Sequence, residues 1–153
     1  MTVNQAKLII ADEPVSALDV SVTAQILNLL KEVQKKNGLS MLFISHDLNV
    51  IRHMADRILV MYAGQLVEEG TTKELINSPL HPYTKLLMAS MPGFRNRDSR
   101  RTIKQNKGAF KSQNAEAGCP FIARCSEAQS LCKQSNPQLK ERKKNRFVAC
   151  HFN

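Results

Sequence analysis

The feature that most constrains the fold is a short apolar run, Leu8–Ala11, which ends in two adjacent acidic residues, Asp12 and Glu13. A run of this length without alternation is typical of a parallel strand that is buried on both faces. Open α/β sheets bind their ligands at the carboxyl ends of the strands, where the two carboxylates would lie. One carboxylate can hold a hydrated Mg²⁺, and the other can orient and deprotonate a water molecule. The alternative is a buried strand whose acidic residues only cap the next turn.

A second strand is predicted over residues 39–45, and it ends at His46 and Asp47. A single histidine after a strand is more often structural than functional. Because His46 follows Asp12 and Glu13 by one helix and one strand, we favour a functional role for this histidine. We therefore take His46 as a candidate site residue.

The first 92 residues alternate predicted strands and helices, which favours an α/β fold with a parallel sheet. A long helix is predicted from Asp19 or Ser21 to about Lys36, ended by Asn37-Gly38. Its apolar stripe is predicted to pack in the core, and its members are Val22, Ile26, Leu29, Leu30 and Val33.

Capping and turn residues mark the other predicted elements. Residues 58–62 and 65–69 are predicted to form a hairpin around Ala63-Gly64. Three further helices are predicted. The first is capped by Asp47 and runs through Met54, and the second begins at the capping box of Thr71 and Glu74 and runs to Asn77. The third begins at His81-Pro82-Tyr83.

Charge divides the chain into two parts. Residues 1–92 hold 8 Lys and Arg against 9 Asp and Glu, whereas residues 93–153 hold 14 against 4. Residues 93–117 are poor in apolar residues and predict a basic flexible linker. Because the basic segment contains no Trp and no Tyr for base stacking, we expect no nucleic-acid partner, and a solvated segment or one resting on acidic lipid head groups is favoured. The predicted domains are residues 1–92, the linker 93–117, and an irregular cysteine-rich extension, 118–153.

All four cysteines lie in the extension, at Cys119, Cys125, Cys132 and Cys150. Their spacing contains no C-x-x-C pair and is not a zinc-finger pattern. The sequence has no apolar run long enough to span a bilayer and no signal segment, which predicts a cytoplasmic chain. In the cytoplasm, four clustered cysteines indicate metal ligation more than disulfides, as a [4Fe–4S] cluster or Zn²⁺. The alternative is four reduced thiols, and His151 is a further candidate ligand.

The stretch from Leu8 to Asp19 resembles the Walker B strand and D-loop of ATP-binding cassette (ABC) ATPases, and Ser45-His46-Asp47 resembles their switch-histidine motif. The resemblance covers residues 7 to about 92 and implies ATP and Mg²⁺ as ligands. It implies that Asp12 coordinates Mg²⁺ through water, Glu13 polarises the attacking water and His46 contacts the γ-phosphate. Ser16 and Asp19 would communicate across an ATPase dimer. Val15 departs from the family, which usually has Thr there.

The family's phosphate-binding loop, G-x-x-x-x-G-K-[ST], is absent, as are its signature motif and Q-loop glutamine. Backbone N–H groups and a lysine of that loop hold the phosphates. The chain therefore resembles the C-terminal half of a nucleotide-binding domain, a partial P-loop NTPase fold. We expect this half alone to be inactive.

The segment Ser78–Leu87, with its His81-Pro82-Tyr83-Thr84 motif, is similar to the region that follows the core in ATPases of oligopeptide and dipeptide importers. The cysteine pattern resembles their C-terminal extension, in which some members bind an iron–sulfur cluster, so [4Fe–4S] is preferred over Zn²⁺. The resemblance implies a subunit that couples ATP hydrolysis to peptide uptake. Its implied partners are a second ATPase subunit, membrane permease subunits and, indirectly, an extracellular or periplasmic peptide-binding protein. The permease would hold it on the inner face of the cell membrane.

Two other classes stay open at this point. The chain could be the remnant of a truncated gene without a function of its own, or a non-catalytic metal-binding regulator. A neighbouring reading frame that encodes the phosphate-binding loop would indicate a split ATPase. The transported peptide is not encoded in this chain, because other subunits select it.

Overall fold

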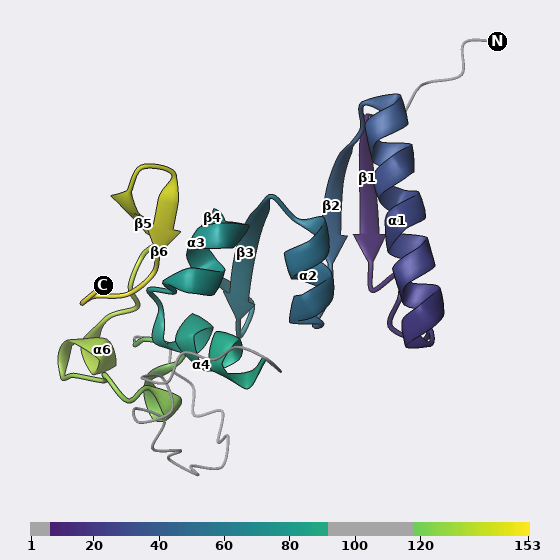
Figure 1. Ribbon diagram of the computed structural model, residues 1–153. Helices are drawn as coiled ribbons and strands as arrows, with labels where there is room; N and C mark the ends of the chain where they lie inside the picture. The colour runs from purple at the N-terminus through teal and green to yellow at the C-terminus, as the bar shows by residue number, and fades with distance from the viewer. Residues whose placement is uncertain (1–6, 92–117) are drawn as a thin grey trace. The chain divides into compact units, whose positions relative to one another are not determined.

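The computed structural model describes residues 7–91 and 118–153, and it shows a mixed α/β chain (Figure 1). The predicted linker, residues 93–117, lies outside the described residues. Contacts divide the chain into two compact units, Met1–Ala55 and Asp56–Asn153. The extension belongs to the second unit, together with residues 56–91.

The first unit contains a parallel pair of strands and two helices. Strand β1 (Leu8–Asp12) pairs with β2 (Ser40–Ile44), in register from Leu8 opposite Ser40 to Asp12 opposite Ile44. Helix α1 (Val20–Asn37) connects them and ends at Gly38, whose φ of 61° is the left-handed conformation that favours glycine at this position. Helix α2 (Leu48–Met54) begins at Asp47, whose carboxylate accepts a hydrogen bond from the Asn49 N–H. These predicted boundaries are confirmed.

One face of this small sheet packs against the helices. Its core consists of Val15, Leu27 and Val50, with Ile26, Phe43 and Met54 against it. The other face is exposed, as are three members of the predicted α1 stripe, Val22, Leu29 and Val33. The predictions that β1 is buried on both faces and that the whole stripe is core were therefore wrong for this unit. Both helices lie on one face of this two-stranded sheet. The residue of α1 that is buried in the core is Leu27, and not Val22, Leu29 or Val33.

The second unit is built on a four-stranded antiparallel sheet with the order β3-β4-β6-β5. The hairpin of β3 (Arg57–Tyr62) and β4 (Gln65–Thr71) turns at Ala63 and Gly64, with φ of 48° and 77°. Two positive φ values are typical of the tight turns that match strand twist. Helices α3 (Thr72–Asn77) and α4 (Pro82–Ser90) follow. The capping box of Thr71 and Glu74 and the proline in the first turn of α4 are confirmed.

The extension is more regular than predicted. It contains a 3₁₀ turn (Ile122–Arg124), helix α6 (Leu131–Gln134), and a hairpin of β5 (Lys140–Lys143) and β6 (Arg146–Val148). Asn145, with φ of 58°, lies in its turn. Strand β6 pairs with β4 through Glu68 opposite Val148, so the extension continues the sheet. Residues 146–148 form strand β6 because they pair with β4, and not because of an apolar pattern in their own sequence.

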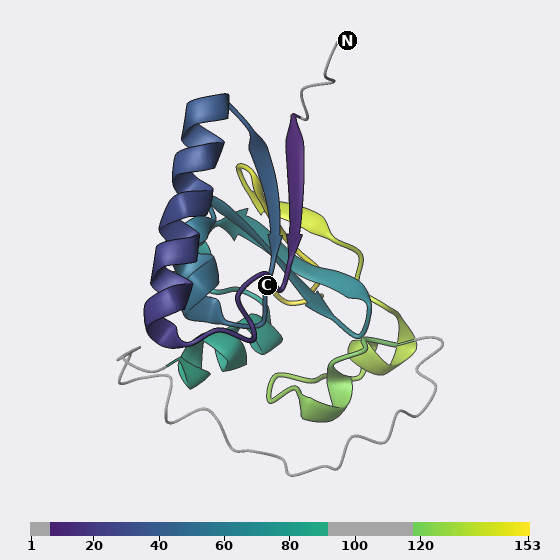
Figure 2. The same ribbon diagram turned by 90° about the vertical axis from the view of Figure 1, so that its right-hand side faces the viewer.

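Aromatic packing also joins the extension to the rest of the second unit. The ring of Phe121 lies 5.1 Å from that of Tyr62 and 5.5 Å from that of Tyr83, measured between centroids. Figure 2 shows the extension beside β3 and β4. In the described part of the chain, no helix has the length and apolar character needed to cross a membrane.

Candidate functional site

The ends of β1 and β2 bring two predicted site residues into contact. Residues 8–12 and 40–44 are paired in parallel, and the pairing extends to the Glu13 N–H, which donates to the Ile44 carbonyl oxygen at 2.9 Å. Glu13 Oε1 lies 2.7 Å from His46 Nδ1 and accepts a hydrogen bond from the His46 N–H at 3.2 Å. Glu13 adopts a φ of 47°, a strained conformation for a non-glycine residue and one that is common at functional sites.

The Glu13–His46 pair is open to solvent, with the side chain of His46 79% exposed and that of Glu13 36%. The hydrogen bond with Glu13 and then its negative charge raise the pKa of His46 above the usual 6.5, and Asp47 adds to this effect. The charged imidazolium of His46 is therefore more favoured than that of a free histidine side chain. With Nδ1 held by Glu13, the other nitrogen of the ring is directed away from the carboxylate, where it can meet an anionic ligand.

Of the other predicted site residues, Ser16 contacts this pair. The Ser16 hydroxyl donates to the Glu13 carbonyl oxygen at 3.1 Å. Asp12 is an exposed residue at the end of β1, and Asp19 precedes α1 without a capping hydrogen bond from its side chain. Within the described residues no group of three or more His, Cys, Asp or Glu side chains is arranged to hold a metal ion. The structure thus joins Glu13, His46 and Ser16, whereas in the described part of the chain no hydrogen bond connects the side chains of Asp12 and Asp19 to them.

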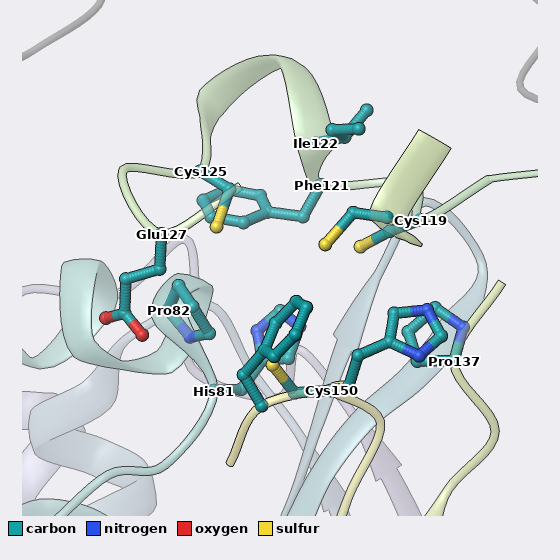
Figure 3. Close-up of a pocket in the computed structure, with 12 residues that line it drawn as sticks. His81, Pro82, Cys119, Phe121, Ile122, Cys125, Glu127, Pro137 and Cys150 are labelled. Carbon is teal, nitrogen blue, oxygen red and sulfur yellow. The ribbon is translucent and has the colours of Figure 1, made fainter. Parts of the chain in front are cut away.

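A second candidate site is a pocket in the extension that all four cysteines line (Figure 3). Cys119 and Cys125 flank the 3₁₀ turn, Cys132 lies in α6, and Cys150 follows β6. The Cys119 N–H donates to the Cys132 carbonyl oxygen at 2.8 Å, and Arg142 donates to the Cys150 carbonyl oxygen at 2.9 Å. The prediction that these four residues meet in one place therefore agrees with the pocket.

The sulfur atoms themselves do not form a metal site. Burial raises the pKa of the Cys119 and Cys125 thiols, although backbone N–H groups of Phe121, Ile122 and Glu127 partly oppose that effect. Without a bound metal ion, burial thus favours the protonated thiol at both positions, and metal binding would have to deprotonate it. Together with the absence of a metal-holding group in the described parts of the chain, this leaves the predicted metal centre unconfirmed. His151, the other candidate ligand, instead bonds the Ser135 carbonyl oxygen through Nε2 at 2.9 Å.

The sequence did not predict that His81 lines this pocket. His81 is 2% exposed, lines the pocket and accepts a hydrogen bond from the Tyr83 N–H on Nδ1 at 3.1 Å. Burial, and to a smaller extent the charge of Lys85, lower its pKa to about 4 against the opposing charges of Glu68 and Glu127. The signal available in the sequence was its position just before Pro82, where a capping side chain is expected.

His81 should make the stability of the second unit depend on pH. Because its folded pKa is lowered from 6.5 to about 4, neutral His81 supports folding fully above pH 6.5, and this contribution is lost as the pH falls toward 4. Between pH 7 and 4 the wild-type chain should lose about 3 kcal/mol more than a His81→Asn variant, which keeps an N-capping oxygen. Urea unfolding at both pH values measures the difference. An NMR titration of His81 near pH 6.5 would contradict the prediction.

A buried ion pair connects the His81 segment to the extension, and sequence reasoning missed it too. Glu68 accepts hydrogen bonds from Arg146 Nη2 at 3.0 Å, from the Leu80 N–H at 2.9 Å and from the His81 N–H at 2.8 Å. Arg146 also donates to the carbonyl oxygen of Ser78. Both charged side chains are almost fully buried. No sequence pattern marks them, because they lie 78 residues apart.

Comparisons with known proteins agree with the motifs. Residues 67–132 match the family described as the oligopeptide/dipeptide transporter, C-terminal region. The oligopeptide transport ATP-binding protein AppF of Bacillus subtilis is 47% identical over 151 residues, which are 95% of this chain and 45% of AppF. The putative oligopeptide transport ATP-binding protein YkfD of the same organism is 50% identical over 149 residues, again 95% of this chain and 45% of the relative. The dipeptide transport ATP-binding protein DppF of Escherichia coli is 48% identical over 143 residues, 94% of this chain and 42% of that protein.

The chain therefore spans slightly less than half the length of the curated relatives that it matches. The resemblance to peptide-transport ATPases is confirmed: over nearly its whole length, this chain is similar to a part of the ATP-binding proteins of oligopeptide and dipeptide transport.

Proposed function

We propose that this chain is the hydrolytic half of an ATP-binding subunit of a peptide-import ABC transporter. The observation that carries the proposal is the contact of 2.7 Å between Glu13 and His46 at the ends of two parallel strands. Ligands of α/β sheets bind at such strand ends. The relatives, which are named as ATP-binding proteins of oligopeptide and dipeptide transport, support ATP as the ligand. The resemblance of Asp12 and Glu13 to a Walker B strand implies Mg²⁺ with it.

The proposed reaction is phosphoryl transfer from ATP to water, in which positioning and charge stabilisation supply most of the catalysis. Glu13 would orient and polarise the attacking water, and the His46 imidazolium would stabilise charge on the γ-phosphate. Mg²⁺ bound through water by Asp12 would neutralise phosphate charge. Ser16 and Asp19 would face a second ATPase subunit. The parallel strand pair would then be part of a larger P-loop sheet.

Permease subunits would be the membrane partners, and they would hold the protein on the cytoplasmic face of the membrane. A peptide-binding protein outside the cell would take part indirectly. These assignments come from the relatives' role in peptide transport, which their names state.

The test is to restore the phosphate-binding part. The part of AppF that lies outside its match to this chain would be fused ahead of residue Leu8, and ATP hydrolysis would be measured with and without Mg²⁺. We expect Mg²⁺-dependent hydrolysis by the fusion and none by this chain alone, which lacks the loop that holds the phosphates. A fusion that binds ATP but never hydrolyses it would favour the alternative that this chain is a non-catalytic metal-binding regulator.

The proposed [4Fe–4S] centre rests on the resemblance and on the single pocket that the cysteines share. In the described arrangement the thiols do not fit a metal ion, so binding would have to deprotonate them and draw them together, as happens when metal binding is coupled to folding. Anaerobically purified protein should then be brown and contain iron and sulfide in equal amounts. Colourless protein with stoichiometric zinc would replace the cluster by a Zn²⁺ site, and metal-free protein with four reactive thiols would refute both.

A further inference from the structure

Two of the four cysteines that line the pocket of the extension, Cys119 and Cys132, are also joined through their backbone. The Cys119 N–H donates to the Cys132 carbonyl oxygen at 2.8 Å. Both residues are buried, with exposed fractions of 9% and 7%, and both line the pocket (Figure 3). The two free thiols therefore face one small space from neighbouring stretches of backbone.

The residue before Cys119 shows how closely these two stretches approach each other. A Cβ atom on Gly118 would lie 2.8 Å from the Cys132 carbonyl oxygen, which is shorter than such contacts are in proteins, so the approach requires glycine. Residues joined by a backbone hydrogen bond have Cα atoms about 5–6 Å apart, inside the range of roughly 4.4–6.8 Å that disulfides require. Cys119 and Cys132 can thus be bridged with little movement of the backbone.

Cys150 is less well placed to pair with Cys119. Its sulfur atom accepts a hydrogen bond from Asn153 Nδ2 at 3.6 Å, and its carbonyl oxygen accepts one from Arg142 Nη2 at 2.9 Å. Burial raises the pKa of the Cys119 thiol most, and among the neighbouring thiols Cys132 raises it more than Cys150 does. The contacts of Cys119 therefore favour Cys132 as its partner.

We propose that Cys119 and Cys132 are a modification site, at which a peroxide of about the size of water, such as hydrogen peroxide, oxidises the two thiols to a disulfide. The thiolate of one cysteine attacks the peroxide, forms a sulfenic acid and releases hydroxide. The thiol of the other cysteine then attacks that sulfur atom, and its proton leaves with the hydroxyl group as water. The peroxide takes up the two electrons that the two thiols lose.

The pocket selects this class of oxidant by size, because it has space for about one water-sized molecule. A larger oxidant such as glutathione disulfide does not fit beside the buried sulfur atoms. Since burial raises the pKa of the Cys119 thiol, its reactive thiolate is scarce at neutral pH and bridging is slow. The bridge would leave Cys125 and Cys150 as the remaining thiols of the pocket, too few for the proposed four-sulfur centre.

The experiment exposes the full chain, reduced and freed of metal with a chelator, to hydrogen peroxide, and then maps its disulfides by mass spectrometry. Cleavage after Arg124, Glu127 and Arg146, by trypsin and a glutamate-specific protease, places each cysteine on a separate peptide. The test variant is Cys132→Ser, and the matched control is Cys150→Ser in the same pocket. Mapping of the wild-type chain tests the proposal even if a variant does not fold.

We expect a bridge between Cys119 and Cys132 within one chain, at least about tenfold more abundant than any other pair, because these two can be joined with little backbone movement. It should form equally in Cys150→Ser, and Cys119 should form no bridge in Cys132→Ser. Glutathione disulfide at the same concentration should produce about tenfold less of it, because the pocket excludes larger molecules.

Three results would overturn the proposal. The first is a predominant bridge to Cys125 or Cys150, or between two chains. The second is oxygen added to single thiols without any bridge. The third is equal bridging by glutathione disulfide and by hydrogen peroxide, which would show that the pocket does not select the oxidant.

Discussion

Replacing Arg146 by leucine is expected to lower the free energy of unfolding of the second unit by about 3–5 kcal/mol. The side chains of Arg146 and Glu68 are 2% and 0% exposed, and Arg146 Nη2 donates to Glu68 Oε1 at 3.0 Å. Without the guanidinium, the Glu68 carboxyl group stays in a site that water does not reach, with the N–H groups of Leu80 and His81 as its remaining hydrogen-bond donors. Urea unfolding followed by tyrosine fluorescence measures this unit selectively, because Tyr62 and Tyr83 are the two tyrosines of the chain.

The exposed ion pair between Lys85 and Glu127, at 2.8 Å, is the natural control. Replacing Lys85 by leucine should cost about 1 kcal/mol or less, since solvent screens such pairs. In a Glu68→Gln background, Arg146→Leu should cost clearly less than in the wild-type chain, because no buried charge is left unpaired. Equal costs for Arg146→Leu in the two backgrounds would show that the guanidinium contributes packing and not charge.

Replacing Glu13 by glutamine in the fused ATPase is expected to reduce turnover by about a thousandfold while ATP stays bound, because a general base contributes roughly 10²–10⁴ to the rate. The amide retains the shape and a hydrogen-bond acceptor toward His46, but it cannot take a proton from water. Single-turnover hydrolysis and equilibrium ATP binding separate the two effects. The raised pKa of His46, which depends first on Glu13, should also return toward 6.5 in this variant.

Glu32→Gln provides the matched control, because Glu32 is an exposed carboxylate of α1 in the same unit. It should leave both turnover and the pKa of His46 unchanged. Turnover near the wild-type rate in Glu13→Gln would remove Glu13 from the proposed role. A normal rate in His46→Ala would likewise make His46 structural.

Local signals in the sequence predicted most of the element boundaries. Gly38 ends α1 because few other residues adopt its left-handed conformation, and Thr71 with Glu74 begins α3 because each satisfies the other's backbone N–H. Such signals act within one helical turn and need no partner elsewhere. Hairpin β5–β6 was missed because its partner strand, β4, lies about 80 residues earlier in the chain.

The candidate sites also differ in whether their features follow from local sequence signals or from the tertiary fold. Glu13 and His46 could be predicted together, because each ends a strand with a recognisable apolar pattern. The buried group of Glu68, Arg146 and His81 could not, since charged residues and histidine are usually exposed and only the tertiary fold pairs them. For the cysteines, clustering in the sequence predicted one metal centre, which stays a prediction; the structure places all four around one pocket, where burial raises the pKa of the Cys119 and Cys125 thiols.

Strand β5 has a consequence for how this sheet ends. All four of its residues, Lys140–Lys143, are exposed and charged, and the strand lies at the outer edge of the order β3-β4-β6-β5. An open edge strand is a template on which another chain can add and begin aggregation, and lysine-rich edges prevent this by repulsion and by the cost of desolvating charge. The charges of β5 are therefore expected to disfavour the addition of a further strand at this edge, an effect that requires neither nucleic acid nor lipid.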